Sequence, residues 1–231
     1  MAVVRTSVVL DSGGSGNTYS WSGGTVSDAP VLQVVLMCGA GPGTHSEPTD
    51  STGGFTTMGF TTHSPWVSGS SNNGWWWWGY RVVAVGDSSA GTITLPGMPN
   101  YTNAHCVMAS YTGFVEAPTP LAAPTAVTAT TSGSVTLYET ATAECVPQMM
   151  VLSPGAGGVT AGASTQPPLN ASSTNLSSYM ESPGPISLSS TLGVSGFSFG
   201  YAMYAVRAAP DPSTSGWSIG TLRFGGGSGW H

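Results

Sequence analysis

Short apolar segments recur along the chain, and clusters of glycine, serine, proline and asparagine separate them. None of these segments keeps apolar residues at the three- and four-residue spacing of an amphipathic helix without an interrupting glycine or proline. Short apolar runs bounded in this way are typical of β-strands, so the pattern predicts an all-β chain. The predicted strands are Val3–Leu10, Val31–Cys38, Phe55–Thr61, Trp75–Val85, Thr92–Leu95, Ala104–Tyr111, Ala126–Thr130, Ser134–Tyr138, Gln148–Leu152, Ile186–Ser189, Phe197–Arg207 and Trp217–Phe224.

Two of these segments indicate different degrees of burial. Val31–Cys38 is apolar almost throughout, which predicts a central strand covered on both faces. Thr92–Leu95 alternates between polar and apolar residues, which predicts a strand with one exposed face. Gly86–Gly91, which precedes it, contains residues that favour tight turns. We therefore expect a hairpin in which Trp75–Val85 and Thr92–Leu95 are neighbours.

The number and spacing of the strands predict an antiparallel sandwich or barrel, built as one domain over residues 1–231 with long Gly/Ser/Pro-rich loops. Ala117–Pro124 has the prolines of an interdomain linker, but it is short and its flanking segments do not repeat each other. A long crossover within one domain is the preferred interpretation. Ser153–Pro185 is low in large apolar residues and longer than the bare loops of compact domains. It predicts an extended arm that contact with another chain stabilises.

The charge composition narrows the classes of partner. The chain has 4 Lys plus Arg against 10 Asp plus Glu, a net charge of −6, and only 6% charged residues. So few cations exclude binding driven by nucleic-acid phosphates or by an anionic lipid surface. No apolar run reaches the length of a membrane span, and Met1–Leu10 has the pattern of a strand instead of a secretory signal. Cys38, Cys106 and Cys145 show no paired spacing, so we expect free, buried thiols made in a reducing cytoplasm.

Two segments contain residue types that bind phosphates or metals. Gly39–Gly43 follows a strand, but Pro42 interrupts it and no Gly-Lys-Ser/Thr follows, so it predicts a plain turn. His45, Glu47 and Asp50 offer imidazole and carboxylate ligands, but no second group of ligands converges on them from elsewhere in the sequence. Neither segment predicts a binding site.

Catalytic arrangements are missing as well. His63, His105 and His231 stand alone, and no nucleophile elbow of the form G-x-S-x-G accompanies them. His105 and Cys106 are adjacent, so in a strand they point to opposite faces. The acidic residues form no pair that would suit glycoside hydrolysis. We therefore expect no catalytic residue, no metal ion and no cofactor.

The tetrad Trp75-Trp76-Trp77-Trp78 is the most unusual local feature. In a strand it places two indoles on each face. Both faces are buried between sheets or subunits, or else one face is exposed and stacks on sugar rings or contacts another chain. Tyr80 and Arg81 continue the strand, and Arg81 is able to stack on an indole or pair with a carboxylate. The candidate ligand or subunit contact residues are Trp75, Trp76, Trp77, Trp78, Tyr80 and Arg81.

The order of these features resembles a family of tailed-phage virion proteins that is common in phages of actinobacteria. The similarity runs from about residue 25 to residue 224 and consists of a pattern of strands and turns. Its parts are Ser27-Asp-Ala-Pro-Val-Leu-Gln-Val-Val-Leu-Met37, the Trp-rich segment leading into Gly79-Tyr-Arg-Val-Val-Ala-Val-Gly-Asp87, Thr92-Ile-Thr-Leu95, Cys106-Val-Met-Ala-Ser-Tyr-Thr-Gly113 and Tyr201-Ala-Met-Tyr-Ala-Val-Arg207. The Trp tetrad and the long Ser/Pro-rich segment depart from simpler members.

This resemblance implies a jelly-roll-like β-sandwich that is assembled into a virion in the host cytoplasm and has no enzymatic activity. It implies a minor tail or tail-tip component that contributes to assembly and host adsorption. Its partners would be other virion proteins and copies of itself in a homo-oligomer, with a host surface glycan as a candidate ligand. Two alternatives stay open, a capsid decoration protein that stabilises the head shell and a free carbohydrate-binding module that uses Trp75–Trp78.

Overall fold

The computed structural model describes residues 3–14, 18–47, 49–50, 53–64, 72–95, 104–128, 134–140, 145–152, 159–161, 176–180, 185–192 and 198–208. Every regular element in this part of the chain is a β-strand, and no helix occurs in it. The strands are β1 (Val4–Gly14), β2 (Thr18–Trp21), β3 (Val31–Pro42), β4 (Thr56–His63), β5 (Asn72–Val83), β6 (Gly91–Thr94), β7 (Ala104–Thr112), β8 (Thr119–Thr128), β9 (Ser134–Thr140), β10 (Cys145–Leu152), β11 (Val159–Ala161), β12 (Leu176–Met180), β13 (Pro185–Leu192) and β14 (Ser198–Arg207). The prediction of an all-β chain is confirmed for these residues.

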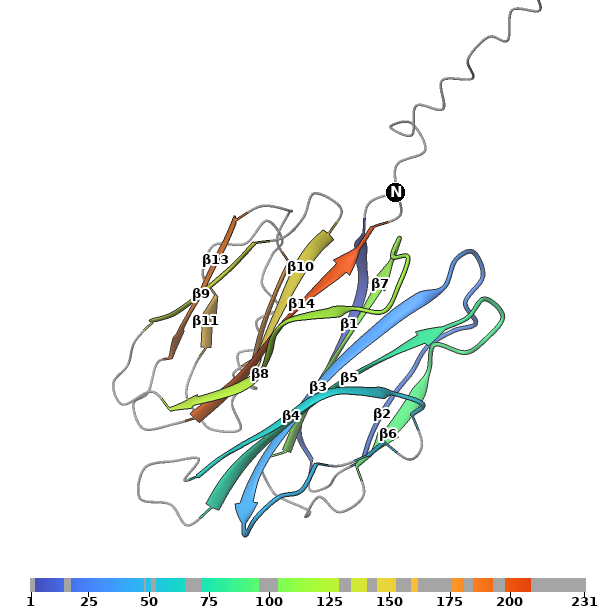
Figure 1. Cartoon of the computed structure of the whole chain (residues 1–231). Helices are drawn as coiled ribbons and strands as arrows, with labels where there is room; N and C mark the ends of the chain where they lie inside the picture. The colour runs from blue at the N-terminus through green and yellow to red at the C-terminus, as the bar shows by residue number, and fades with distance from the viewer. Residues whose placement is uncertain are drawn as a thin grey trace, which may run out of the picture.

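The described strands form four sheets, and all strand pairs are antiparallel (Figure 1). The largest, here called the central sheet, has the strand order β1-β7-β3-β5-β4. A second sheet, here called the β14 sheet, has the order β12-β10-β14-β8. The strands β2 and β6 form a separate two-stranded ribbon, and β11-β13-β9 form a three-stranded sheet. Figure 1 shows the β14 sheet on one side of the central sheet and the β2–β6 ribbon on the other.

Strand β3 lies in the middle of the central sheet and is buried on both faces. Its residues from Leu32 to Gly41 are all buried, and only its ends reach solvent. The side chains alternate, so Leu36 faces the β14 sheet while Met37 faces the β2–β6 ribbon. The prediction for Val31–Cys38 is confirmed. The alternation predicted for Thr92–Leu95 is confirmed too, because Ile93 and Leu95 are 0% exposed while the threonines reach the surface.

Two apolar cores therefore flank the central sheet. The β14-side core consists of Val3, Leu32, Val34, Leu36, Cys38, Trp76, Trp78, Val107, Ala109, Tyr111, Tyr204 and Val206. The β6-side core consists of Tyr19, Trp21, Val35, Met37, Phe55, Trp75, Trp77, Ile93, Leu95, Cys106 and Met108. Each core draws alternate residues from β3, β5 and β7, so one sheet holds two layers in place.

The structure corrects the prediction of a turn at Gly39–Gly43. Strand β3 continues through Gly39 to Pro42, and the chain turns only at Gly43, where φ is 90°. Gly39 pairs with Trp75 across the sheet, and a glycine there leaves room for the indole. Gly39 is therefore not part of a turn but the small partner of a large aromatic residue.

The predicted hairpin between Trp75–Val85 and Thr92–Leu95 is also wrong. Strand β6 pairs with β2 and belongs to a different layer from β5. The connecting residues bond to the segment after β2 instead, since Gly86 N donates to Val26 O at 2.8 Å and Ser89 N donates to Gly24 O at 2.9 Å. The glycine-rich connection thus carries the chain from the central sheet to the ribbon.

Proline-rich Ala117–Pro124 is largely strand and not a bare crossover. Thr119 to Pro124 belong to β8, which is an edge strand of the β14 sheet. Proline lacks the N–H group that a central strand needs, so an edge position tolerates it. Within the predicted arm Ser153–Pro185, β11 and β12 pair with β13 and β10 of the same chain. The predicted strand Trp217–Phe224 lies outside the described residues.

Glycines at two positions of the central sheet give the tryptophans their space, and substitution there is expected to destabilise the fold. A Cβ atom at Gly39 would lie 2.7 Å from the Trp75 ring, and one at Gly79 would lie 2.5 Å from the Trp77 ring. Both rings are buried and cannot withdraw. We expect Gly39→Ala and Gly79→Ala to lower the free energy of unfolding by about 1–3 kcal/mol each, measured by urea denaturation.

Gly24→Ala is the matched control, because a Cβ atom at Gly24 would meet no atom within 4 Å. This control should leave stability unchanged or raise it slightly through the lower entropy of the unfolded chain. Equal effects at all three glycines would contradict the steric explanation.

A hydroxyl pair links the central sheet to β14. Tyr111 on β7 and Tyr204 on β14 place their oxygens 2.8 Å apart, and both side chains are 0% exposed. We expect Tyr111→Phe or Tyr204→Phe to cost about 1 kcal/mol. The double variant should cost less than the sum, because the second substitution removes a bond that is already lost. Denaturant unfolding of the four proteins measures this coupling, and strictly additive effects would exclude it.

Candidate functional site

The tryptophan tetrad lies in the interior of the chain. Trp75, Trp76, Trp77 and Trp78 are each 0% exposed on β5, which is bordered by β3 and β4. Trp76 and Trp78 belong to the β14-side core, while Trp75 and Trp77 belong to the β6-side core. The alternative in which both faces are buried therefore describes the folded chain, and the burial lies between layers of a single molecule.

The contacts of the indole rings are those of packed core residues. Trp78 lies 4.9 Å from Tyr204 between ring centroids, and Trp77 meets Phe55 edge to face at 6.5 Å. Trp77 Nε1 donates a hydrogen bond to Thr57 Oγ1 at 3.0 Å. Among the described residues, no acceptor meets the buried Nε1 atoms of Trp75 and Trp78. No ring face is left at the surface for a sugar or a second chain to contact.

Arg81 forms the most connected polar cluster of the described residues. Its guanidinium lies over the rings of Trp21 and Phe55, with Cζ 5.1 Å and 5.3 Å from their centroids, and the two rings meet each other edge to face. Arg81 Nε donates to Gln33 Oε1 at 2.7 Å, and Nη1 donates to Gly53 O at 3.1 Å. The prediction that Arg81 stacks on an indole is confirmed, but the indole is Trp21 of the ribbon and not one of the tetrad.

The carbonyl of Ser89 is shared by three donors in this cluster. Trp21 Nε1 donates to it at 2.7 Å, Gln33 Nε2 at 2.8 Å and Arg81 Nη2 at 3.3 Å, and Arg81 Nη2 also donates to Ala90 O at 3.0 Å. These bonds tie β3, β5, β2 and the loop before β6 together. The half-buried cation therefore joins the central sheet to the ribbon.

Burial lowers the pKa of Arg81 from its ordinary value, and the negative charge of Asp50 opposes that shift. The Asp50 carboxylate accepts backbone hydrogen bonds from Gly53 N at 2.9 Å and Phe55 N at 2.8 Å, which shapes the loop before β4. A guanidinium stays charged at neutral pH, so the site is a half-buried cation held by carbonyl oxygens and aromatic faces.

Tyr80 and Arg81 are only partly buried, unlike the four tryptophans. Tyr80 packs partly against the β14-side core, and both residues line a shallow hollow of about 400 Å³ together with Gly54, Thr56 and Val82. The structure thus places the tetrad in the two cores and places Tyr80 and Arg81 beside one surface hollow. It does not bring all six candidates together in one binding site.

The cysteine and histidine side chains that the structure describes are also buried. Cys38 and Cys106 are buried thiols that form no disulfide, as predicted, and they belong to opposite cores. His45 is 7% exposed. Among the described residues, no group of three or more His, Cys, Asp or Glu side chains converges as a metal site. The side chains of His63, His105 and Cys145, and all of His231, lie outside the described residues.

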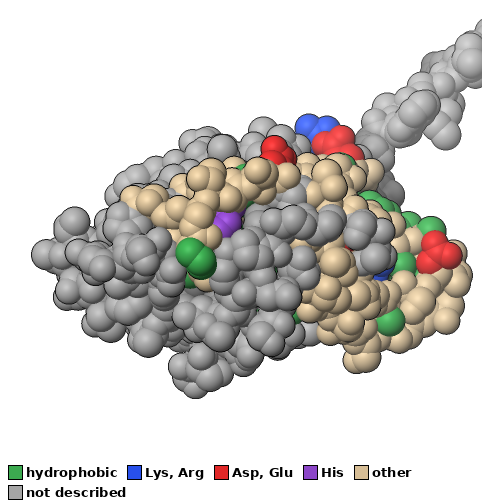
Figure 2. All heavy atoms as spheres, turned by 90° about the horizontal axis from the view of Figure 1, so that it is seen from below, with side chains coloured by type: hydrophobic (Ala, Val, Ile, Leu, Met, Phe, Trp, Pro, Cys, Tyr) green, Lys and Arg blue, Asp and Glu red, His purple; other side chains and the backbone are tan. Residues whose placement is uncertain are grey.

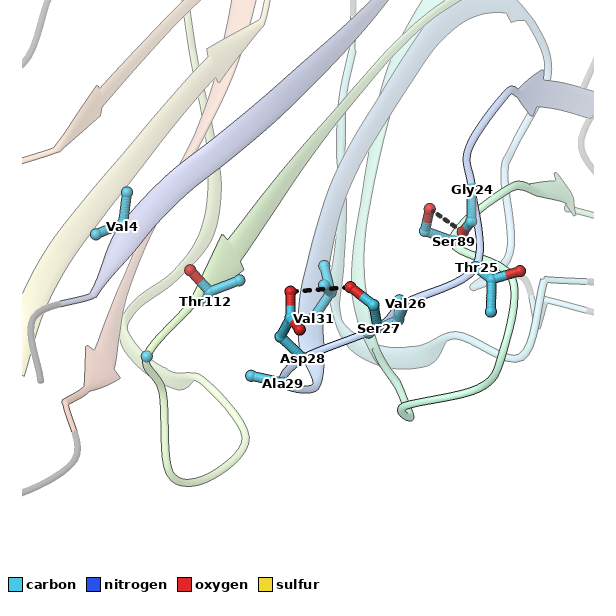
Figure 3. Close-up of a pocket in the computed structure, with 11 residues that line it drawn as sticks. Val4, Gly24, Thr25, Val26, Ser27, Asp28, Ala29, Val31, Ser89 and Thr112 are labelled. Atoms are coloured by element: carbon cyan, nitrogen blue, oxygen red, sulfur yellow. Dashed lines mark hydrogen bonds between the residues drawn. The ribbon is translucent and has the colours of Figure 1, made fainter.

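A groove that the sequence did not predict lies between the end of the central sheet and the segment before β3 (Figure 3). Its volume is about 690 Å³. Val4 and Thr112 line one side, while Val26 and Ala29 line the other. These residues come from separate parts of the chain, so no local pattern could have indicated the groove. Asp28 is the ionisable side chain among those that line it.

The described surface carries few charges. Among the atoms that are coloured by type in Figure 2, uncharged side chains and backbone predominate, with a few acidic and basic groups between them. Arg207 and Glu116 form an exposed ion pair of 3.3 Å. Val4, Val82, Val85 and Val115 are exposed by 47–52%. Apolar and neutral groups therefore meet solvent where an ordinary soluble domain has many charges.

The described residues contain no helix that is both long and apolar enough to cross a membrane. No protein-family model matches the chain, and neither a curated protein nor a solved structure matches it.

Proposed function

We propose that this chain is a non-enzymatic structural protein of a tailed-phage virion, a minor tail or tail-tip component that contributes to assembly and host adsorption. In this proposal the antiparallel sheets are a jelly-roll-like β-sandwich, and the partners are other virion proteins and further copies of the chain. The observation that carries the proposal is the complete burial of the Trp75–Trp78 tetrad between two layers of the same molecule.

The burial of the tetrad supports a structural role, because its four tryptophans stabilise the fold and do not form a binding site at the surface. Four indoles bury a large apolar area, and each contributes several kcal/mol to a folded domain. Arg81, which has the chemistry to bind an anionic ligand, is instead bonded to carbonyls of its own chain. A protein that must stay folded as part of a particle benefits from two cores on one sheet.

The surface supports assembly with other chains. A charge content of 6% is low for a freely diffusing protein, and exposed valines at 47–52% offer apolar contact area. The chain contains no lysine, the residue that commonly protects sheet edges from pairing. Neighbouring subunits would cover such edges in a particle.

Capsid decoration is the second candidate, since the same surface would suit a head shell. The third, a free carbohydrate-binding module, needs an exposed aromatic platform, and the tetrad supplies none. The residue pattern that resembles phage virion proteins favours the first two over the third.

Immunogold labelling of purified virions from the phage that encodes the chain tests this proposal. The antibody is raised against the purified chain, and antibody absorbed with that chain is the control. Label on the tail is the expected result. Label over the head would replace the tail role with capsid decoration, and particles without label would overturn the proposal of a virion protein.

A further inference from the structure

Strand β4 borders the central sheet and leaves its outer edge open. It pairs with β5 on one side, and in the described part of the chain no strand pairs with its other side (Figure 1). Strand β8 lies close to β4 but forms no strand pair with it. Each residue from Thr56 to Thr62 is exposed or half-buried. The N–H and C=O groups on the outer side of β4 are therefore available to another strand.

The other edges of the two larger sheets have features that oppose such pairing. β8 contains Pro120 and Pro124, which cannot donate a backbone hydrogen bond, and β1 contains the charged residues Arg5 and Asp11. β12 is only five residues long. β4 has eight residues without proline, Lys, Arg, Asp or Glu, and its protective feature is a register shift in its pairing with β5. It is therefore the edge of these sheets that is most suited to a further strand.

The register shift determines which β4 side chains share a face. Met58 packs against the β14-side core, whereas Thr57 and Phe60 lie on the side of the β6-side core, where Thr57 accepts the hydrogen bond of a tetrad indole. Residues paired across two strands share a face, so Gly59, which pairs with Trp78, lies on the same side as Met58. Met58 and Gly59 thus occupy one face in succession instead of alternating.

We propose that β4 is the contact between two copies of this chain, whose β4 strands pair antiparallel and join the two central sheets. A twofold axis between Met58 and Gly59 places Met58 of one copy beside Gly59 of the other. The same axis places Thr57 beside Phe60. In both pairs the two residues lie on the same face of their sheets, as antiparallel pairing requires.

The outer threonines of β4 fit the same arrangement. Thr56 and Thr61 pair with Tyr80 and Trp76, so both lie on the β14 side, and the twofold axis brings Thr56 of one copy beside Thr61 of the other. Cross-strand threonine pairs stabilise sheets through hydrogen bonds between their hydroxyls. The β2–β6 ribbon of this chain already contains such a pair, whose Oγ1 atoms lie 3.0 Å apart.

The two central pairs combine large side chains with small ones. Phe60 beside Thr57 is an aromatic residue against a β-branched one, a combination that stabilises antiparallel strands. Met58 beside Gly59 gives the longer side chain the space above a residue without a Cβ atom, as Gly39 does for an indole within the central sheet. Neither pair brings two bulky side chains together.

The charge of β4 favours a second copy over a charged partner. The chain carries a net charge of −6, which opposes the association of identical copies. β4 itself contains no Asp, Glu, Lys or Arg, so this pairing brings no like charges beside each other. A charged partner strand would find no opposite charge on β4. The inference deepens the self-association in the proposed function and rests on that function for its biological role.

Sedimentation velocity of the full-length chain tests the pairing in solution. One pair of strands is a small contact, below the interfaces of about 1,200–2,000 Å² that form stable complexes, so monomer and dimer should interconvert. We expect monomer at about 1 µM and a rising share of dimer towards about 1 mM. A chain that stays monomeric throughout this range would overturn the inference, while the labelling of virions would still decide the proposed function.

Charged variants identify the paired residues. Thr56→Asp with Thr61→Asp places two carboxylates beside each other at both ends of the contact, and Thr56→Lys with Thr61→Lys does the same with two ammonium groups. We expect each variant to raise the dissociation constant of the dimer by about tenfold or more, and an equimolar mixture of the two to restore association. Ser22→Asp with Thr25→Asp is the matched control, because it adds the same charge at exposed positions outside β4 and should leave association nearly unchanged.

Hydrogen–deuterium exchange of the wild-type chain locates the contact without any substitution, and circular dichroism verifies that the variants are folded. We expect peptides from Thr56–His63 to exchange more slowly at the high concentration than at the low one, with no such change in Thr18–Trp21. A dimer that protects other segments but not Thr56–His63 would overturn the assignment of β4. Charged variants that associate as well as the wild type, or a mixture that does not restore association, would also overturn it.

Discussion

Replacement of Trp76 and Trp78 with alanine is expected to leave the chain largely unfolded. Both side chains are 0% exposed and belong to the β14-side core, where Trp78 also contacts Tyr204. A buried tryptophan replaced by alanine costs about 3–5 kcal/mol, from lost transfer free energy and from the cavity that remains. Two such losses approach or exceed the total stability of a typical domain, which is about 5–15 kcal/mol.

Circular dichroism and thermal unfolding of the double variant measure this effect, and Val82→Ala is the control. Val82 lies on the same strand as the tetrad but is 49% exposed, so its substitution should change the free energy of unfolding by about 0.5 kcal/mol or less. The intrinsic fluorescence of the wild-type chain should not respond to added glycans. A double variant that keeps its melting temperature, together with a wild type whose fluorescence changes with a glycan, would support an exposed sugar platform instead.

Removal of the Arg81 guanidinium is expected to separate the β2–β6 ribbon from the central sheet. In Arg81→Met, Gln33 Oε1 and the carbonyls of Gly53 and Ala90 lose their donor. A buried polar atom left without its partner costs about 1–3 kcal/mol, and because water reaches this half-buried cluster we expect a total loss within that range of about 1–3 kcal/mol. The aromatic rings of Trp21 and Phe55 also lose the cation that lies over them.

Arg81→Lys and Arg207→Met provide the comparison for this variant. Lysine retains the charge but not the planar fork, so Arg81→Lys should recover only part of the stability. Arg207 forms an exposed ion pair with Glu116, and Arg207→Met should cost about 0–1 kcal/mol. Urea denaturation of the three variants gives the values. An Arg81→Met variant as stable as Arg207→Met would show that the cation cluster contributes little.

The sequence predicted those elements whose burial follows from local pattern. The continuous apolar run of Val31–Cys38 required cover on both faces, and the alternation of Thr92–Leu95 required one buried face. Both features depend on nearest neighbours alone. The ribbon strand β2 was missed because Thr18–Trp21 is only four residues long and lies among glycines and serines.

Strand pairing could not be predicted in the same way. Turn residues at Gly86–Gly91 favoured a hairpin, but β6 pairs with a strand distant in sequence, as the hydrogen-bonded pair Ser20 and Thr92 shows. The pairing of two strands that are distant in sequence depends on how the sheets pack against each other. The turn propensity of the residues between two strands does not determine that pairing. Gly39 was predicted to be part of a turn for the same reason, because the ring that it accommodates belongs to Trp75 on another strand.

Some features of the candidate site were also predictable from the sequence, and others were not. Alternation in a strand correctly indicated that the tetrad divides into two pairs of indoles, and the chemistry of arginine correctly indicated stacking on an aromatic ring. The identity of that ring, Trp21, depended on the ribbon and was not predictable. The groove at Asp28 likewise joins segments that are far apart along the chain.

The central claim is that the tryptophan-rich strand is the interior of the single molecule, and not a surface that a partner must cover. Hydrogen–deuterium exchange of the isolated chain, verified as monomeric, tests it most directly. We predict that peptides from Val31–Pro42 and Asn72–Val83 exchange more slowly than peptides from the exposed segment of residues 22–30. Fast exchange across Asn72–Val83 in the monomer, with protection only after assembly, would contradict the account.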